Sequence, residues 1–139
     1  MKTTPRMQGV ITRLIEKHES EFRHWGDERC LHLELAGFAP LLIVVNELTV
    51  CVVHEEMEDG AVNAWPEVVF YTGGKRWVPI HANGIDGKEQ SYALLNWKQG
   101  GIIPLKEAAS QQVEEARRCE AWALDLQHQG WLEHASQPQ

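Results

Sequence analysis

The chain has 139 residues, of which 43% are hydrophobic and 24% charged, and its formal net charge is −7. A domain of this length buries enough apolar surface to fold without a metal ion or a disulfide. No run approaches the roughly 18 apolar residues of a membrane-spanning helix, and the first 20 residues lack an apolar stretch of signal-peptide length. We expect a single cytoplasmic domain, 1–139, with no membrane association.

The first predicted element is a helix at about 5–19, fraying towards Gly26. Thr4 is a suitable N-cap and Pro5 is tolerated at the first helical position. The apolar residues that follow recur at helical spacing and form one stripe. They are Met7, Val10, Ile11, Leu14 and Ile15.

From Cys30 the apolar period changes to two, which is typical of a half-buried strand. The run 41–45 is almost wholly apolar and predicts a central strand covered on both faces. Further strands are predicted at 49–53, 68–72, with Pro66 at the strand start, and 76–82, where Pro79 favours an edge position. The segment 83–103 is predicted to be irregular, with either a short strand or one helical turn at 92–97.

A second helix is predicted at about 104–129, with Trp122 on its apolar face and Gly130 just past its end. The tail, 135–139, is predicted to be disordered. The fold class is therefore α+β: an antiparallel sheet of about five strands over about 30–82, packed by an N-terminal helix and a long C-terminal helix. An exposed edge strand or exposed tryptophans would also permit a homodimer.

Charge and cysteine usage indicate the setting and the kind of partner. Residues 31–74 contain seven carboxylates and no Lys or Arg. Such a region repels phosphates, so direct nucleic-acid binding is disfavoured, whereas a basic protein surface would be attracted. Cys30, Cys51 and Cys119 cannot all pair within one chain and show no CxxC spacing, which favours free thiols in a reducing compartment.

The densest polar group, and the candidate functional patch, lies at the end of the third predicted strand. It consists of His54, Glu55, Glu56, Glu58 and Asp59. In an extended strand His54 and Glu56 share one face, and His81 or Asp86 could complete a divalent cation site with them. No known ligand spacing is matched, so we expect a solvated strand end, no bound metal and no cofactor.

One run of short motifs resembles a bacterial family that is catalogued as a domain of unknown function and occurs in plasmid-borne and other mobile-element genes. The motifs are a strand ending in His54, a turn with Gly60, the Pro-Glu-x-x-Phe strand at 66–70, the Trp-x-Pro strand at 77–79 and a helix carrying Trp122. The resemblance covers about 30–131 and implies a prokaryotic, cytoplasmic setting. It implies no activity.

Two hypotheses about function remain open. The favoured one is a non-enzymatic protein-interaction module that uses the acidic sheet region. The alternative is a small metal-dependent or hydrolytic enzyme centred on His54, although the chain has no GxSxG or phosphate-loop motif. The direction of His54 distinguishes them: a cleft shared with Glu56, His81 or Asp86 favours the enzyme, and burial against turn backbone favours a structural histidine.

Overall fold

The computed structural model describes residues 1–58, 61–83 and 88–138, and within them the side chains outside 56–65. The helices are α1 (Pro5–Lys17), α2 (Ala109–Gln129) and α3 (Trp131–His134), with 3₁₀ turns at Glu19–Glu21 and Lys106–Ala108. The strands are β1 (Arg23–Trp25), β2 (Glu28–Leu33), β3 (Leu41–Val45), β4 (Thr49–Glu58), β5 (Ala61–Tyr71), β6 (Val78–Asn83), β7 (Glu89–Ser91), β8 (Ala93–Asn96) and β9 (Gly101–Pro104).

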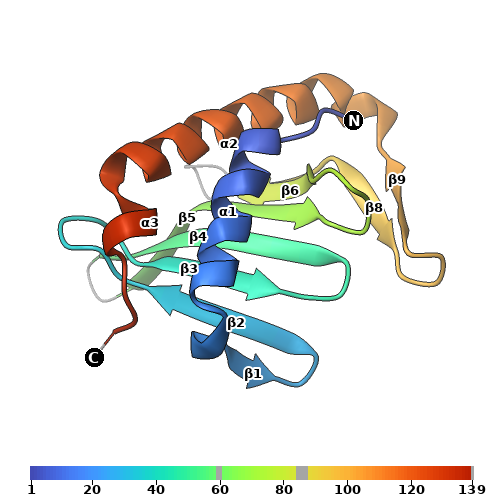
Figure 1. Cartoon of the computed structure of the whole chain (residues 1–139). Helices are drawn as coiled ribbons and strands as arrows, with labels where there is room; N and C mark the ends of the chain where they lie inside the picture. Colours follow the sequence, from blue (N-terminus) through green and yellow to red (C-terminus); the bar gives the residue numbers. More distant parts are fainter. Residues whose placement is uncertain (59–60, 84–87, 139) are drawn as a thin grey trace.

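The α+β prediction is confirmed. Strands β1 to β7 form one antiparallel sheet in chain order, and β8 and β9 form a separate hairpin. Helices α1 and α2 lie on the same side of this sheet, which we call the inner face (Figure 1). None of the described helices is long and apolar enough to cross a bilayer.

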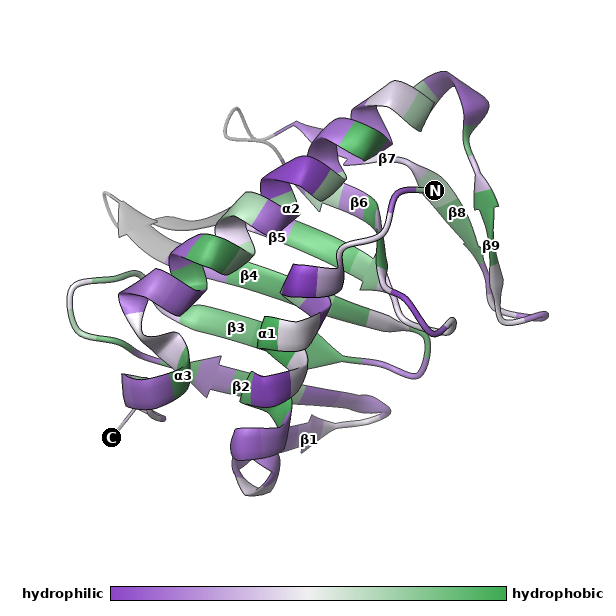
Figure 2. Cartoon of the chain, turned by 45° about the horizontal axis from the view of Figure 1, so that its top comes forward, coloured by the Kyte–Doolittle hydropathy of each residue, from purple (hydrophilic) through white to green (hydrophobic). Residues whose placement is uncertain are grey.

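The core forms where apolar side chains of the inner face meet the helices. The ribbon of the central strands is coloured mostly hydrophobic in Figure 2. Leu31, Ile43, Val52 and Val68 are opposite one another on four successive strands. All four are at most 2% exposed. Burying one such side chain contributes about 1.5–3 kcal/mol, so this row anchors the two layers.

The start of α1 is stabilised by a residue far along the chain rather than by the predicted cap. Thr4 makes no side-chain cap, and its hydroxyl instead donates to the carbonyl of Trp77 at 3.3 Å. The carboxylate of Glu120 on α2 accepts from the backbone N–H groups of Arg6, at 3.1 Å, and Met7, at 2.8 Å. A carboxylate at a helix N-terminus also complements the helix dipole, so α2 caps α1.

The sheet is larger than predicted because short strands extend it at both ends. The predicted fraying after α1 is wrong: β1 forms a hairpin with β2 and adds an edge strand. The prediction that 83–103 is irregular is wrong in its described part, where β7, β8 and β9 lie, although β8 confirms the short-strand alternative at 92–97. Strands of three or four residues carry too few side chains for an alternating pattern to emerge.

Pro66 is predicted to begin a strand and Pro79 to mark an edge strand, but both lie inside longer, internal strands. Pro66 is within β5, next to the irregularity in the β4–β5 register between Val53 and Glu55. Pro79 is within β6, which pairs with β5 and β7 and is therefore not an edge strand. Its pairing with β5 also shifts beside Pro79, and pairing with β7 begins only at His81. Proline is tolerated because the ladder is interrupted there.

The C-terminal segment follows the prediction in part. Gly130 ends α2 with φ 89°, as expected of a C′ glycine. The helix begins at Ala109 rather than at 104, because Pro104 ends β9. The predicted disorder of the tail does not hold at Ser136, which forms a β-bridge with Glu34, or at Gln137, whose side-chain amide donates to the carbonyl of Glu21 at 2.6 Å.

Glu115 on α2 is a carboxylate inside the core, where it is 7% exposed. It accepts from the hydroxyl of Tyr92 at 3.2 Å and lies 3.5 Å from the guanidinium of Arg118. Burial raises the pKa of Glu115, and the nearby Arg118 opposes this only in part. The folded state therefore binds a proton at this carboxyl more tightly than the unfolded chain does.

The raised pKa predicts a specific pH dependence. The stabilisation from protonated Glu115 is fully present below the ordinary glutamate pKa and is lost as pH rises through the raised one. In Glu115→Gln this loss is absent, so its free energy of unfolding, relative to wild type, increases with pH across that window. Urea unfolding of both proteins from acidic to neutral pH measures the difference. Glu114→Gln, at the exposed neighbouring position, is the control. If the difference in free energy of unfolding between Glu115→Gln and wild type does not change with pH, the raised pKa of Glu115 is contradicted.

Candidate interaction surface

His54 lies at the inner face, lodged between the turn after β2 and the helices. Its Nδ1 is 3.2 Å from the carbonyl oxygen of Ala39 and 3.4 Å from that of Pro40. Its ring lies 5.5 Å from that of Trp122 and 5.7 Å from that of Trp131. Carbonyls only accept, so Nδ1 carries the proton and donates it to turn backbone. This is the position expected of a structural histidine.

Of the predicted metal-binding residues, the structure describes the side chains of His54 and His81, and it does not bring these two together. His81 is on the opposite face of the sheet from His54, with Nδ1 2.9 Å from the hydroxyl of Ser91 and Nε2 3.9 Å from Glu89. The side chains of Glu56, Glu58, Asp59 and Asp86 lie outside the described part. Within the described part, no three His, Cys, Asp or Glu residues are grouped so that they could hold a metal ion.

The other side of the sheet, which we call the outer face, carries two cross-strand rows of side chains. Residues directly opposite one another in an antiparallel sheet project to the same face, so the register defines both rows. One row is Arg23, Cys30, Val44, Cys51, Val69, His81 and Ser91, and the other is His32, Leu42, Val53, Glu67, Asn83 and Glu89. Val53 is the only residue of these rows that is buried.

The outer face is covered at one end and open at the other. Over β5 and β6 the β8–β9 hairpin packs Leu95 and Ile102 against a cluster that contains Val69, Val78 and Ile80. Over β2 to β4 the side chains of Cys30, Leu42, Val44 and Cys51 are only half-buried. At the open edge, Trp25 on β1 is 82% exposed. The apolar surface thus continues outward beyond the hairpin that covers part of it.

Carboxylates surround this open apolar surface. Burial raises the pKa of the Cys30 thiol, and the negative charges of Glu55 and Glu28 raise it further. Burial, with Glu67 and Glu28, raises the pKa of Cys51 to about 12. The Cys51 thiol lies 3.9 Å from the carboxylate of Glu67, which also accepts from the amide of Asn83 at 2.8 Å. Glu28, Glu55 and Glu67 therefore act together on the outer face, which we call the acidic rim.

Sequence reasoning found part of this surface. It singled out Glu55 and the acidic character of the sheet region, but it placed the candidate patch at His54. It did not identify the outer rows or Trp25. The available signal was the apolar run of β3, which predicts cover on both faces, whereas the helices of this chain cover only one.

The three cysteines allow a direct test of these positions, because two belong to the outer face and Cys119 is 1% exposed on α2. Thiolates are the reactive species, and all three thiol pKa values are raised. In the native protein we expect iodoacetamide to modify Cys30 fastest, Cys51 more slowly and Cys119 slowest, with all three reacting alike in urea. Peptide mass spectrometry over time measures the order. Native labelling of Cys119 ahead of Cys30 contradicts the placement of the outer face.

Comparisons with known proteins assign this chain to no family. No family model, curated protein or solved structure significantly matches this chain. The resemblance to the bacterial domain of unknown function therefore stays a prediction.

Proposed function

We propose that this chain is a non-enzymatic protein-interaction module whose outer face binds a basic partner surface with an apolar centre. The observation that carries the proposal is the row of half-buried apolar side chains on β2 to β4, bordered by the acidic rim. A cytoplasmic setting, as the resemblance implies, is part of the proposal and is consistent with three free cysteines.

The apolar part of the argument rests on β3 and β4. Leu42 and Val44 on β3 stand beside Val53 and Cys51 on β4, so the outer-face rows are continuous across neighbouring strands, and all but the buried Val53 are half-buried. Contiguous exposed apolar surface with a polar border is characteristic of protein-binding sites. The four strands β1 to β4 at the usual spacing are roughly 15 Å across, which is wide enough for one helix.

The charges favour a basic partner over a second copy of this chain. In a two-fold contact through the outer face each subunit presents the same patch. The rim residues Glu28, Glu55 and Glu67 would then meet like charges across the interface, and among the described outer-face rows Arg23 is the one Lys or Arg side chain that offsets them. Lysines and arginines on a different protein would instead pair with the rim and accelerate its encounter.

The alternative is a small metal-dependent or hydrolytic enzyme centred on His54. The contacts of His54 support a structural role more strongly, because its ring packs between two tryptophans and its Nδ1 proton points to the carbonyls of 39 and 40. His81 on β6 lies beside Ser91 and Glu89 on the edge strand β7, where Glu89 is largely exposed. That arrangement is also common among solvated cross-strand residues.

The test captures partners from a lysate of the organism that encodes the chain, at about 0.05 M and about 0.5 M salt. The bait is the full chain, compared with a rim variant carrying Glu28→Gln, Glu55→Gln and Glu67→Gln. A matched control carries Glu16→Gln, Glu107→Gln and Glu133→Gln at exposed helix positions, so both variants lose three negative charges.

We expect wild type and control to retain the same basic protein at low salt. The rim variant should retain at least about tenfold less of it, and high salt should weaken the wild-type complex similarly. Equal capture by both variants, or no partner at either salt, would overturn the proposal. Circular dichroism of each variant verifies that the fold is intact.

A further inference from the structure

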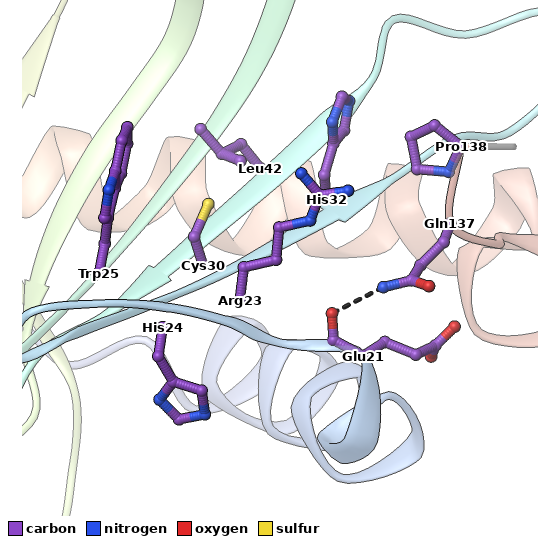
Figure 3. Close-up of a pocket in the computed structure, with 9 residues that line it drawn as sticks. All are labelled: Glu21, Arg23, His24, Trp25, Cys30, His32, Leu42, Gln137 and Pro138. Carbon is purple, nitrogen blue, oxygen red and sulfur yellow. Dashed lines mark hydrogen bonds between the residues drawn. The ribbon is translucent and has the colours of Figure 1, made fainter.

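A pocket of about 520 Å³ opens at the free edge of the outer face, between β1 and the C-terminal tail. Its volume is within the usual range of small-molecule sites, about 300–1,000 Å³. Figure 3 shows Arg23, Trp25, Cys30, His32 and Leu42 on one side of the sheet, whereas His24 points to the other. Glu21, Gln137 and Pro138 complete its wall.

The pocket contains an available positive charge. Arg23 is the single Lys or Arg on the described outer-face rows, and it forms no ion pair with any residue that the structure describes. Its guanidinium acts on the pocket, because it lowers the pKa of Cys30 against the larger raising effects of burial, Glu55 and Glu28. His32 is exposed on the same side and adds ring nitrogens for a second hydrogen bond. A planar guanidinium fits the two oxygens of a carboxylate.

The pocket also has an apolar side and a wall whose backbone is held in place. Leu42 and the Cys30 thiol lie beside the exposed Trp25, whose backbone pairs with Glu28 across the tight turn at Gly26, φ 60°. The opposite wall is fixed by the bond from Gln137 to the Glu21 carbonyl and by the bridge between Ser136 and Glu34. A preorganised wall reduces the entropy lost when a ligand binds.

We propose that this pocket binds a small monocarboxylate with a flat apolar body, of the arylalkanoate class. The carboxylate is held by Arg23 and His32, and the body packs against Trp25, Leu42 and Cys30. One negative charge matches one guanidinium, whereas a phosphate dianion would be repelled more strongly than a monocarboxylate by Glu21 and by the Glu28 and Glu55 charges that act on Cys30. This site does not depend on the proposed protein partner, although Cys30 and Leu42 also belong to the outer face.

The test is a titration of the full ¹⁵N-labelled chain with indole-3-acetate, followed by ¹H–¹⁵N NMR, with indole-3-acetamide as the neutral matched probe. We expect shifts at the amides of Trp25, Cys30 and His32 with the acid, and binding at least about tenfold weaker with the amide. In Arg23→Gln the acid should bind about as weakly as the amide does to wild type. Arg29→Gln, on the inner side of β2, is the matched control and should leave the affinity for the acid unchanged.

Several outcomes would overturn the proposal. They are the absence of shifts at these three amides at millimolar ligand, equal affinities for acid and amide, or an Arg23→Gln variant that binds the acid like wild type. Equal capture by the rim and control variants, which would overturn the protein-binding proposal, leaves this titration unaffected, so the failures of the two proposals are distinguishable.

Discussion

Replacing Trp131 by alanine should lower the free energy of unfolding by about 3–5 kcal/mol, the usual cost of removing a fully buried large aromatic side chain. Trp131 is 0% exposed and is the largest fully buried side chain among the described residues. Its ring contacts His54 and Phe38, at centroid distances of 5.7 Å and 6.4 Å, and its indole N–H donates to Gln129 at 2.9 Å. The variant would leave a cavity between the turn after β2 and the start of α3.

Urea unfolding followed by circular dichroism measures this loss, and the melting temperature should fall by roughly 10–20 °C. Trp97→Ala is the matched control, because Trp97 is 62% exposed on the β8–β9 hairpin. We expect that control to change stability by less than about 0.5 kcal/mol. Similar losses for the two variants would show that Trp131 does not occupy the core position described above.

The second large effect concerns the apolar centre of the outer face. Val44→Asn should weaken binding of the captured basic partner by about 10-fold to 100-fold, because the interface would then bury an amide without a partner. Val44 is well placed for this test, since it pairs with Cys30 on one side and Cys51 on the other. Its side chain is half-buried in the free chain, so the variant should still fold.

Val113→Asn is the matched control for this measurement, because Val113 is 42% exposed on α2, away from the outer face. Isothermal titration calorimetry with the purified partner gives both affinities. The melting temperature of each variant separates loss of binding from loss of folding. Unchanged affinity in a folded Val44→Asn variant would exclude this row from the interface.

The elements that were predicted correctly have strong local patterns. The stripe of Met7, Val10, Ile11 and Leu14 predicts α1, and Gly130 predicts the end of α2. The elements that were missed are stabilised by partners distant in sequence. β1 exists because it pairs with β2, and the tail is ordered because Ser136 bridges to Glu34. Glu120 likewise caps α1 from more than 110 residues away, a contact that no local pattern indicates.

The candidate site was only partly predictable for a related reason. An apolar strand such as β3 predicts that both of its faces are covered, and the sequence does not show what covers them. The helices cover the face of Leu41 and Ile43, and those two side chains are fully buried. Leu42 and Val44 point the other way and remain half-buried. The sequence of β3 predicts cover on both faces, whereas the helices cover one face only. This difference indicates a partner for the outer face.

The most direct measurement is a footprint of the complex with the captured partner, based on the alkylation rates of the three cysteines. If the outer face is the interface, the partner slows modification of Cys30 and Cys51 by at least about tenfold, as expected for thiols removed from solvent. The rate at Cys119, in the inner core, stays unchanged. If the partner binds while Cys30 and Cys51 react as in the free chain, the interface lies elsewhere and the account of the outer face is wrong.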